Sequence, residues 1–313
     1  MEAADFNCID IKEEEIINEE KVAAPEDAIP EDAIPEDVAS PEEVASPEVV
    51  VEEVVVEEVA VEEVAASEEV KLYIEEIIKN DKEDLNIPKN IFLTHKSLAH
   101  INSQPKLVKC FNSWAQYKTQ YKIHFFTDEM CHQFMKTHFP GKTYQAYCRL
   151  PMAVMKADLW RYCVLYIHGG IYSDADAECR VNPNIFTSAK SLLVCAPESD
   201  NIHLCQWCFA APKNSPILKY IIDLSVKRIL EIPQIKGEHV IHYLTGPGCF
   251  TAGIELYLKD NKQSVYENKL EYKKYRNNMM CVFNTTFFHK IIYHYFAGSD
   301  KNGWKQERYH KMM

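Results

Sequence analysis

The segment that covers residues 151–173 constrains the fold of this chain more than any other. It opens with PMAVMKADLWRYCVLYI (residues 151–167), an apolar pattern that predicts a buried helix. Gly169-Gly170 is the glycine stop that is expected after such a helix. The apolar step Ile171–Ser173 then predicts a short strand. A helix that leads at once into a strand in this way is typical of an α/β fold.

Two carboxylates, Asp174 and Asp176, follow this strand directly. In an extended chain residues i and i+2 point to the same side, so the two carboxylates would lie close together on one face. Like charges this close raise each other's pKa unless a cation lies between them. The alternative for a bare D-x-D pattern is a solvated turn, and the surrounding sequence has to decide between the two.

The predicted helix carries an acid and a base, Asp158 and Arg161, which are three residues apart and share one face. They can contact each other or a shared ligand. The alternative is a local ion pair, which would stabilise the helix by only about 0.3 kcal/mol. Because an acid and a base are costly to bury on an apolar helix unless they are satisfied, this context favours a site.

Further segments extend the α/β pattern in both directions. Strands are predicted at residues 87–95, 121–126, 191–196 and 207–211, and helices at residues 107–120, 129–138 and 216–230. Thr127 or Asp128 can cap the second of these helices. The polar loop Thr245–Gly248 opens another helix that runs through Leu258, and its amides can serve an anionic or hydroxylated ligand or simply cap the helix. Ligand sites in open α/β sheets gather at the carboxyl ends of strands, where the two aspartates lie.

The chain divides by charge into an acidic leader and a basic body. Residues 1–84 contain 30 Asp and Glu against five Lys, whereas the remaining 229 residues contain 17 Asp and Glu against 29 Lys and Arg. The leader repeats PEDAI and VVVEE units, whose period of five residues spreads the valines around a helix axis and argues against a coiled coil. We expect residues 1–66 to be disordered, residues 67–85 to form a helical linker and residues 86–313 to form one domain. The acidity of the leader also suits a docking tail for a basic partner.

Cysteine usage and hydropathy indicate the compartment. The eleven cysteines are scattered and odd in number, which argues for free thiols in a reducing environment. The pair Cys205 and Cys208 has no second pair at zinc-ribbon spacing. The sequence contains neither a signal-peptide pattern nor a run of 18 apolar residues. A cytoplasmic protein without a transmembrane segment and without a nucleic-acid partner is therefore expected.

Four blocks, in order, resemble the glycosyltransferase family whose sugar-binding region contains a DXD motif. They are IPKNIFLTHKS from residue 87, ADLWRYCVLYIHGGIYSDADAEC from residue 157, TGPG from residue 245 and HYFAGS from residue 294. The similarity covers residues 86–308, and the leader has no counterpart in it. This family includes fungal outer-chain and inositol-phosphoceramide mannosyltransferases, bacterial capsular polysaccharide glycosyltransferases and proteins of large DNA viruses, so a virus-encoded protein is one expectation.

The resemblance implies a GT-A-type fold, a Rossmann-like open mixed sheet flanked by helices. It implies transfer of a hexose from a UDP- or GDP-sugar to a glycan, lipid or protein acceptor, with retention of configuration and with Mn²⁺ or Mg²⁺ as cofactor. On this basis Asp176 binds the metal directly, Asp174 binds it through water and touches the donor, and His294 closes the site. Asp158 and Arg161 would contact hydroxyls of the donor sugar, and these two residues and both aspartates are the expected catalytic residues.

Further donor contacts are also implied by the resemblance. A base pocket, a ribose contact and phosphate contacts would come from Thr94, His95, Tyr172, Gly246, Ser299 and Trp304. In members of the family the serine and the tryptophan are adjacent, whereas here four residues separate Ser299 from Trp304. The chain departs from the family at this point.

Two other functions stay open. A metal-dependent nucleotidyl- or phosphotransferase can also use paired aspartates, but the phosphate-binding pattern G-x-x-x-x-G-K-[ST] is absent from the sequence. A non-catalytic interaction protein, in which the acidic leader acts on a decayed enzyme domain, is opposed by the intact acids and arginine of the motif.

Deletion of residues 1–66 is expected to leave the folding of the body nearly unchanged. A segment this acidic and poor in aromatic residues cannot bury enough apolar surface to order itself. The measurement is thermal unfolding of the full and the shortened chain. A melting temperature lowered by more than about 5 °C, which corresponds to over ~1 kcal/mol for a domain of this size, would show that the leader packs on the body.

Overall fold

The structure is a computed structural model that describes residues 85–200, 202–237, 239–262 and 280–295. The leader and its helical linker lie outside these residues, so the disorder of the one and the helix of the other stay predictions. So do the expected donor contacts of Ser299 and Trp304.

The described body is built on an open mixed sheet, which confirms the predicted fold class. The strand order is β2-β1-β3-β6-β5-β7. β6 runs antiparallel to both of its neighbours, and the other pairs are parallel. The bounds are β1 Asn90–Thr94, β2 Lys122–Phe126, β3 Gly170–Asp174, β5 Leu193–Cys195, β6 Cys208–Ala211 and β7 Met280–Val282.

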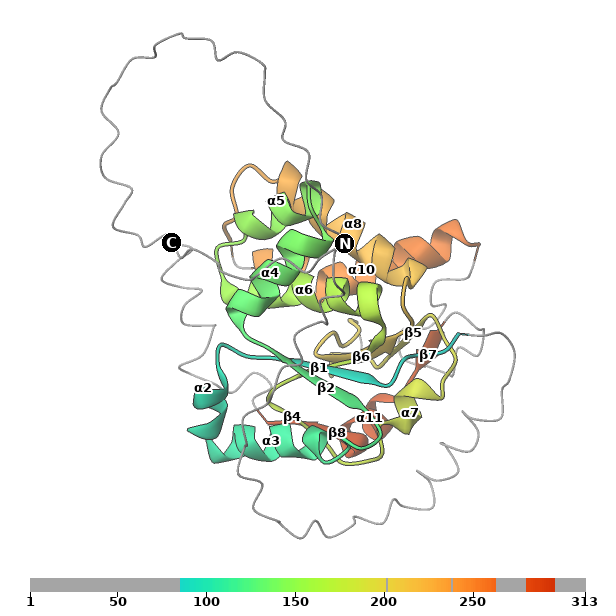
Figure 1. Cartoon of the computed structure of the whole chain (residues 1–313). Coiled ribbons are helices and arrows are strands. Elements are labelled where there is room, and N and C mark those ends of the chain that lie inside the picture. The colour runs from blue at the N-terminus through green and yellow to red at the C-terminus, as the bar shows by residue number, and fades with distance from the viewer. Residues whose placement is uncertain (1–84, 201, 238, 263–279, 296–313) are drawn as a thin grey trace, which may run out of the picture. The chain divides into compact units, whose positions relative to one another are not determined.

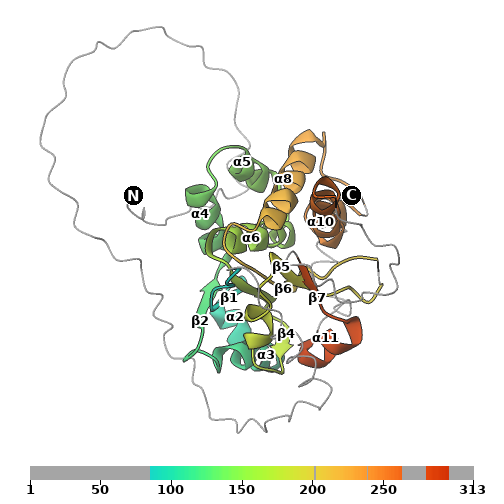
Figure 2. The same cartoon turned by 90° about the vertical axis from the view of Figure 1, so that its right-hand side faces the viewer.

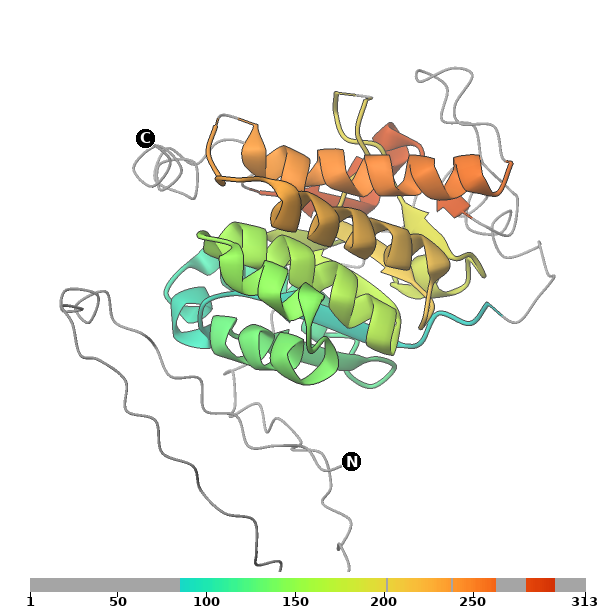
Figure 3. The same cartoon turned by 90° about the horizontal axis from the view of Figure 1, so that it is seen from above.

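Helices cover both faces of this sheet (Figures 1 and 2). One layer, seen from above in Figure 3, contains α4 Asp128–His138, α5 Lys142–Arg149, α6 Ala153–His168, α8 Pro216–Glu231, α9 Val240–Leu244 and α10 Pro247–Asp260. The other contains α2 Leu98–Asn102, α3 Pro105–Ala115, α7 Asn184–Thr187 and α11 Thr285–Ile291, together with a small two-stranded ribbon of β4 Ala177–Cys179 and β8 Ile292–His294.

Side chains of the strands alternate between the two layers, as a period of two requires. Phe92 and Tyr172 belong to the core under the α6 layer, whereas Ile91, Leu93 and Ile171 belong to the core on the opposite face. The sheet therefore has a hydrophobic core on each face. No described helix is long and apolar enough to cross a membrane.

The predicted helix at residues 151–167 is α6, and the two glycines end it as expected. Gly169 is the C-cap, with φ 64°, and Gly170 opens β3 with φ 129°. Both values lie in the region that favours glycine. A Cβ atom on Gly170 would lie 2.5 Å from the backbone oxygen of Asn90. The second glycine therefore lets β3 approach β1 closely, which places the aspartates that follow at the end of a central strand.

Other predicted elements are present with shifted ends. The helix expected at 107–120 is α3, which begins at Pro105 and ends at Ala115. Thr127 caps α4, since its side chain accepts a hydrogen bond from the Met130 amide. The prediction missed the short elements α2, α5, α7, α9, α11, β4, β7 and β8. Their sequences are too short for a clear periodicity, and elements of this length depend on tertiary packing.

Gly170→Ala is expected to destabilise the fold by about 2 kcal/mol more than Gly141→Ala, measured by urea unfolding. Both glycines have positive φ, so both alanines carry backbone strain of about 1–2 kcal/mol. Only the alanine at position 170 also collides with the backbone of Asn90, because a Cβ on Gly141 meets nothing within 4 Å. Equal losses of unfolding free energy in the two variants would mean that β1 moves aside without an energetic cost.

Candidate active site

The aspartates lie where the chain leaves the main sheet. Asp174 is the last residue of β3, Ala175-Asp176 forms a turn, and β4 begins at Ala177. The extended conformation expected through both aspartates is therefore wrong, because the chain has to turn here to start the second ribbon. β8 pairs antiparallel with β4, and His294 lies opposite Ala177.

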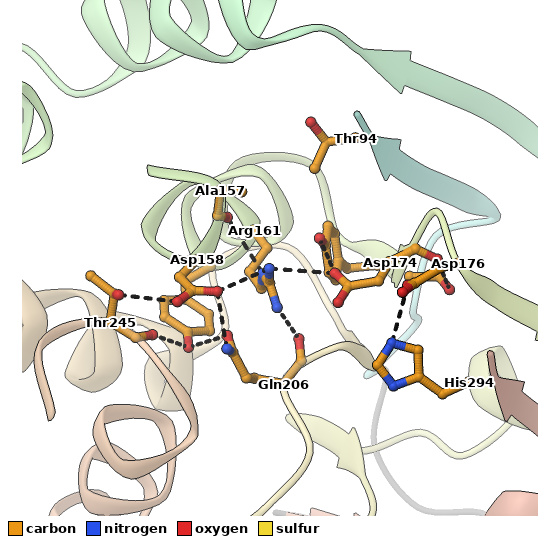
Figure 4. A network of polar contacts seen from close by, with 12 residues as sticks. Thr94, Ala157, Asp158, Arg161, Asp174, Asp176, Gln206, Thr245 and His294 are labelled. Carbon is orange, nitrogen blue, oxygen red and sulfur yellow. Dashed lines mark hydrogen bonds and ion pairs between the residues drawn. The ribbon is translucent and has the colours of Figure 1, made fainter. Parts of the chain in front are cut away.

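This pairing brings three metal-ligand groups together. Ligand atoms of Asp174, Asp176 and His294 all lie within 4.8 Å of one another. Nε2 of His294 is 3.1 Å from Oδ1 of Asp176 (Figure 4). Burial, together with the charge of Asp176, raises the pKa of Asp174 although Arg161 opposes the rise. Two carboxylates and an imidazole form a mixed O/N donor set that can hold a divalent cation.

Arg161 connects the helix to this cluster. Its Nη2 lies 2.9 Å from Oδ1 of Asp158 and 3.3 Å from Oδ1 of Asp174. Its Nη1 donates to the backbone oxygen of Gln206 at 3.1 Å, and the guanidinium lies 4.7 Å from the ring centroid of Tyr172. Arg161 is only 4% exposed. The local surface ion pair, which was the alternative, is therefore wrong, since the arginine joins α6 to β3 inside the protein.

Asp158 is held entirely by protein groups. One oxygen accepts hydrogen bonds from Arg161 and from Nε2 of Gln206 at 3.0 Å, and the other accepts from the Thr245 hydroxyl at 3.0 Å. The side chain is 2% exposed. In this arrangement Asp158 fixes the orientation of Arg161, and its expected contact with the donor sugar stays a prediction.

Gln206 and Trp207 belong to the site but were not found from the sequence. Gln206 bonds both members of the Asp158–Arg161 pair. The Trp207 ring stacks on the His294 ring, with centroids 4.5 Å apart and planes 21° apart. The backbone oxygen of Trp207 accepts from the Asp174 amide at 2.7 Å. Both residues lie between Cys205 and Cys208, outside the four blocks of the family resemblance, and only the approach of β6 to β3 shows their role.

The expected donor residues have different surroundings. The Tyr172 hydroxyl donates to Oδ1 of Asp174 at 2.6 Å. The Thr94 hydroxyl donates to the Phe126 oxygen at 2.9 Å, and it lies apart from the network in Figure 4. The Gly246 amide donates to the Ile241 oxygen at 2.8 Å, so this amide caps a helix, which was one of the two alternatives for this loop.

His95 differs from these residues because it has an unused polar atom. Among the residues that the structure describes, its Nδ1 is buried without a hydrogen-bond partner. Its ring stacks on His100, with centroids 4.9 Å apart. Burial, followed by the charges of His100 and Lys96, lowers the pKa of His95 to about 4, so the ring is neutral at pH 7.

The comparison with known families agrees with this geometry. Residues 104–192, from the start of α3 to the loop before β5, match the family described as "Glycosyltransferase sugar-binding region containing DXD motif". Residues 104–192 therefore resemble the DXD-containing sugar-binding region of glycosyltransferases. This confirms the family resemblance predicted from the motifs.

Curated relatives of the DXD family extend the match. An initiation-specific alpha-1,6-mannosyltransferase of Candida albicans is 28% identical over 222 residues, which cover 60% of this chain and 58% of the relative. The Schizosaccharomyces pombe protein of that name is 32% identical over 140 residues, or 38% of this chain and 35% of the relative. An uncharacterized glycosyltransferase, L373, of Acanthamoeba polyphaga mimivirus is 27% identical over 143 residues, or 45% and 54%. The match thus spans between 35% and 58% of the length of these relatives.

Among solved structures, the PaToxG glycosyltransferase superposes with a TM-score of 0.44 at 19% identity. The superposition covers 62% of this chain and 78% of that chain.

Arg161→Lys is expected to lower kcat/KM for nucleotide-sugar hydrolysis by roughly ten- to a thousand-fold. Lysine keeps the charge but loses the planar fork that reaches Asp158, Asp174 and the Gln206 oxygen at once. Arg149→Lys is the matched control, because Arg149 is exposed on α5 and bonds only the carbonyls of Leu230 and Ile232. Wild-type kinetics in the Arg161 variant would show that the fork has no role in turnover.

Proposed function

We propose that this protein is a metal-dependent hexosyltransferase that transfers a sugar from a UDP- or GDP-sugar to a hydroxyl group of a glycan acceptor. The observation that carries the proposal is the convergence of His294, from β8, with Asp174 and Asp176 of the DXD region at the end of β3. Mannose is the first candidate sugar, because two of the fungal relatives are named mannosyltransferases. The family resemblance adds retention of configuration.

Asp176 and His294 would hold the divalent cation directly, and Asp174 would hold it through water. When bound, the cation neutralises the negative charge that develops on the leaving diphosphate. Neighbouring side chains hold these candidate ligands in position. Tyr172 and Arg161 both contact Oδ1 of Asp174, which would leave its other oxygen for the cation. Stacking on Trp207 fixes the plane of the His294 ring.

Arg161 would contribute a second positive charge next to the leaving group. Because it is buried, its charge is screened less than a surface charge would be. Asp158, Gln206 and Thr245 hold the guanidinium network in place before a substrate arrives, so little reorganisation is needed during the reaction. The leaving phosphate would accept the proton of the acceptor hydroxyl, as the resemblance implies.

The nucleotide base would bind near the carboxyl end of β1. A neutral His95 with a buried, unpartnered Nδ1 can donate or accept a hydrogen bond there, according to its tautomer. A base edge with a complementary donor or acceptor would satisfy this atom and remove the cost of leaving it unpaired.

Asp176→Asn tests the proposed function directly. The substitution preserves size but removes one ligand charge, so hydrolysis of the sugar nucleotide is expected to fall by at least about a hundred-fold. Mn²⁺ with GDP or UDP should raise the melting temperature of the wild type, because a ligand that binds only the folded state stabilises it. The variant should lose most of this rise. Its stability without metal should be unchanged or slightly higher, because a like-charge pair is relieved.

Asp223→Asn is the matched control. It removes the same charge from an exposed pair with Lys219 on α8 and should keep full activity and the full metal response. If Asp176→Asn retains wild-type hydrolysis and the same metal response, the aspartates form a solvated turn and the proposed function is wrong. Metal-dependent nucleotidyl transfer without sugar release would favour the nucleotidyltransferase alternative.

A further inference from the structure

His294 reaches the metal cluster from a strand that is weak by itself. β8 contains three residues, and within the described part of the chain it pairs only with the three residues of β4. An isolated two-stranded ribbon of this size is marginal in water. On its N-terminal side β8 is anchored in the core by Ile291 and Ile292, which are fully buried. On its C-terminal side the anchor is Tyr295.

Tyr295 is fixed by a charged cluster around Glu178 of β4. The Tyr295 hydroxyl donates to Oε2 of Glu178 at 2.9 Å and accepts from Nζ of Lys109 at 2.9 Å. Lys109, on α3, also lies 2.9 Å from Oε1 of Glu178. Arg180 donates to Oε2 of the same carboxylate at 3.1 Å. Both oxygens of Glu178 are therefore engaged, and its side chain is only 11% exposed.

The Glu178 cluster is connected to the metal ligands by backbone contacts. The amide of Tyr295 donates to the backbone oxygen of Asp176 at 3.1 Å. Glu178 lies opposite Tyr293 in the ribbon, and Tyr293 and Tyr295 flank His294 along the chain. A movement of Tyr295 would shift both the imidazole of His294 and the turn that carries Asp176.

We propose that Glu178, Lys109 and Tyr295 form a positioning cluster that holds His294 and Asp176 at the spacing a divalent cation needs. The proposal rests on the metal site of the proposed function and adds residues that do not themselves bind the metal. Lys109 is the informative member, since its ammonium group holds both the carboxylate and the tyrosine hydroxyl.

A purely electrostatic role and a positioning role predict opposite changes in cation affinity when Lys109 is substituted. If only charge mattered, removal of a positive charge near the site would strengthen the binding of a cation. If Lys109 positions Tyr295, its removal loosens β8 and weakens that binding. Lys109 is 59% exposed on its side chain, so its substitution should not prevent folding.

The experiment is a titration with Mn²⁺ alone, in which free Mn²⁺ is followed by its electron paramagnetic resonance signal. Lys109→Gln should raise the Kd for Mn²⁺ by about three- to ten-fold, less than the ten- to hundred-fold typical of groups that touch a ligand directly. Lys109→Arg, which can keep the ion pair, should stay within about two-fold of the wild type. Lys219→Gln removes an equal charge on α8 and should leave the Kd unchanged or slightly lower.

Tyr295→Phe gives a second test without a change of charge. It removes only the hydroxyl that joins Lys109 to Glu178 and should also weaken Mn²⁺ binding. The proposal is overturned if Lys109→Gln binds Mn²⁺ as tightly as Lys219→Gln or more tightly, or if Tyr295→Phe binds like the wild type. If the wild-type protein binds no Mn²⁺, the metal site itself does not exist, and the proposed function is wrong as well.

Discussion

The buried guanidinium of Arg161 is the interaction on which the rest of the site depends. A charge taken out of water costs several kcal/mol unless it is paired and hydrogen-bonded, and Arg161 is paired with both Asp158 and Asp174. With Asp176 added, three carboxylates face one guanidinium, which leaves a net charge of −2 if His294 is neutral. A divalent cation balances that charge, so the pairing of Arg161 prepares the site for a metal without itself neutralising it.

The order of the strands explains how residues far apart in sequence meet. β3 is central, with β1 on one side and the antiparallel β6 on the other. The reversed direction of β6 places its first residues beside the last residues of β3, which is why Gln206 and Trp207 reach the aspartates. In Figure 4 the network runs from Thr245 through Asp158 and Arg161 to Asp174. The covering helices, the sheet and the site are therefore held together by the same polar contacts.

The small ribbon of β4 and β8, with the turn that leads into it, supplies two of the three candidate metal ligands. Its turn supplies Asp176, and its second strand supplies His294. Its stability comes from side chains around it. Trp114 of α3 donates to the Ala177 oxygen, and the Ser113 hydroxyl accepts from the Cys179 amide along the free edge of β4. Under the proposed function, this contact with α3 would make metal affinity sensitive to residues that never touch the metal.

The sequence by itself determined the α/β class, the end of α6 at two glycines and the presence of the paired aspartates beside Asp158 and Arg161. These features are local, since apolar periodicity, glycine conformations and residue spacing are readable over a few turns of chain. The motifs also pointed to His294, but only by resemblance. The tertiary structure decided that Asp158 is enclosed by Gln206 and Thr245, that the Gly246 amide is used within the protein, and that Trp207 stacks on His294. The contacts of Asp158 and of Trp207 join residues 48 to 87 positions apart. Local sequence preferences carry no information about which distant segments will pack together.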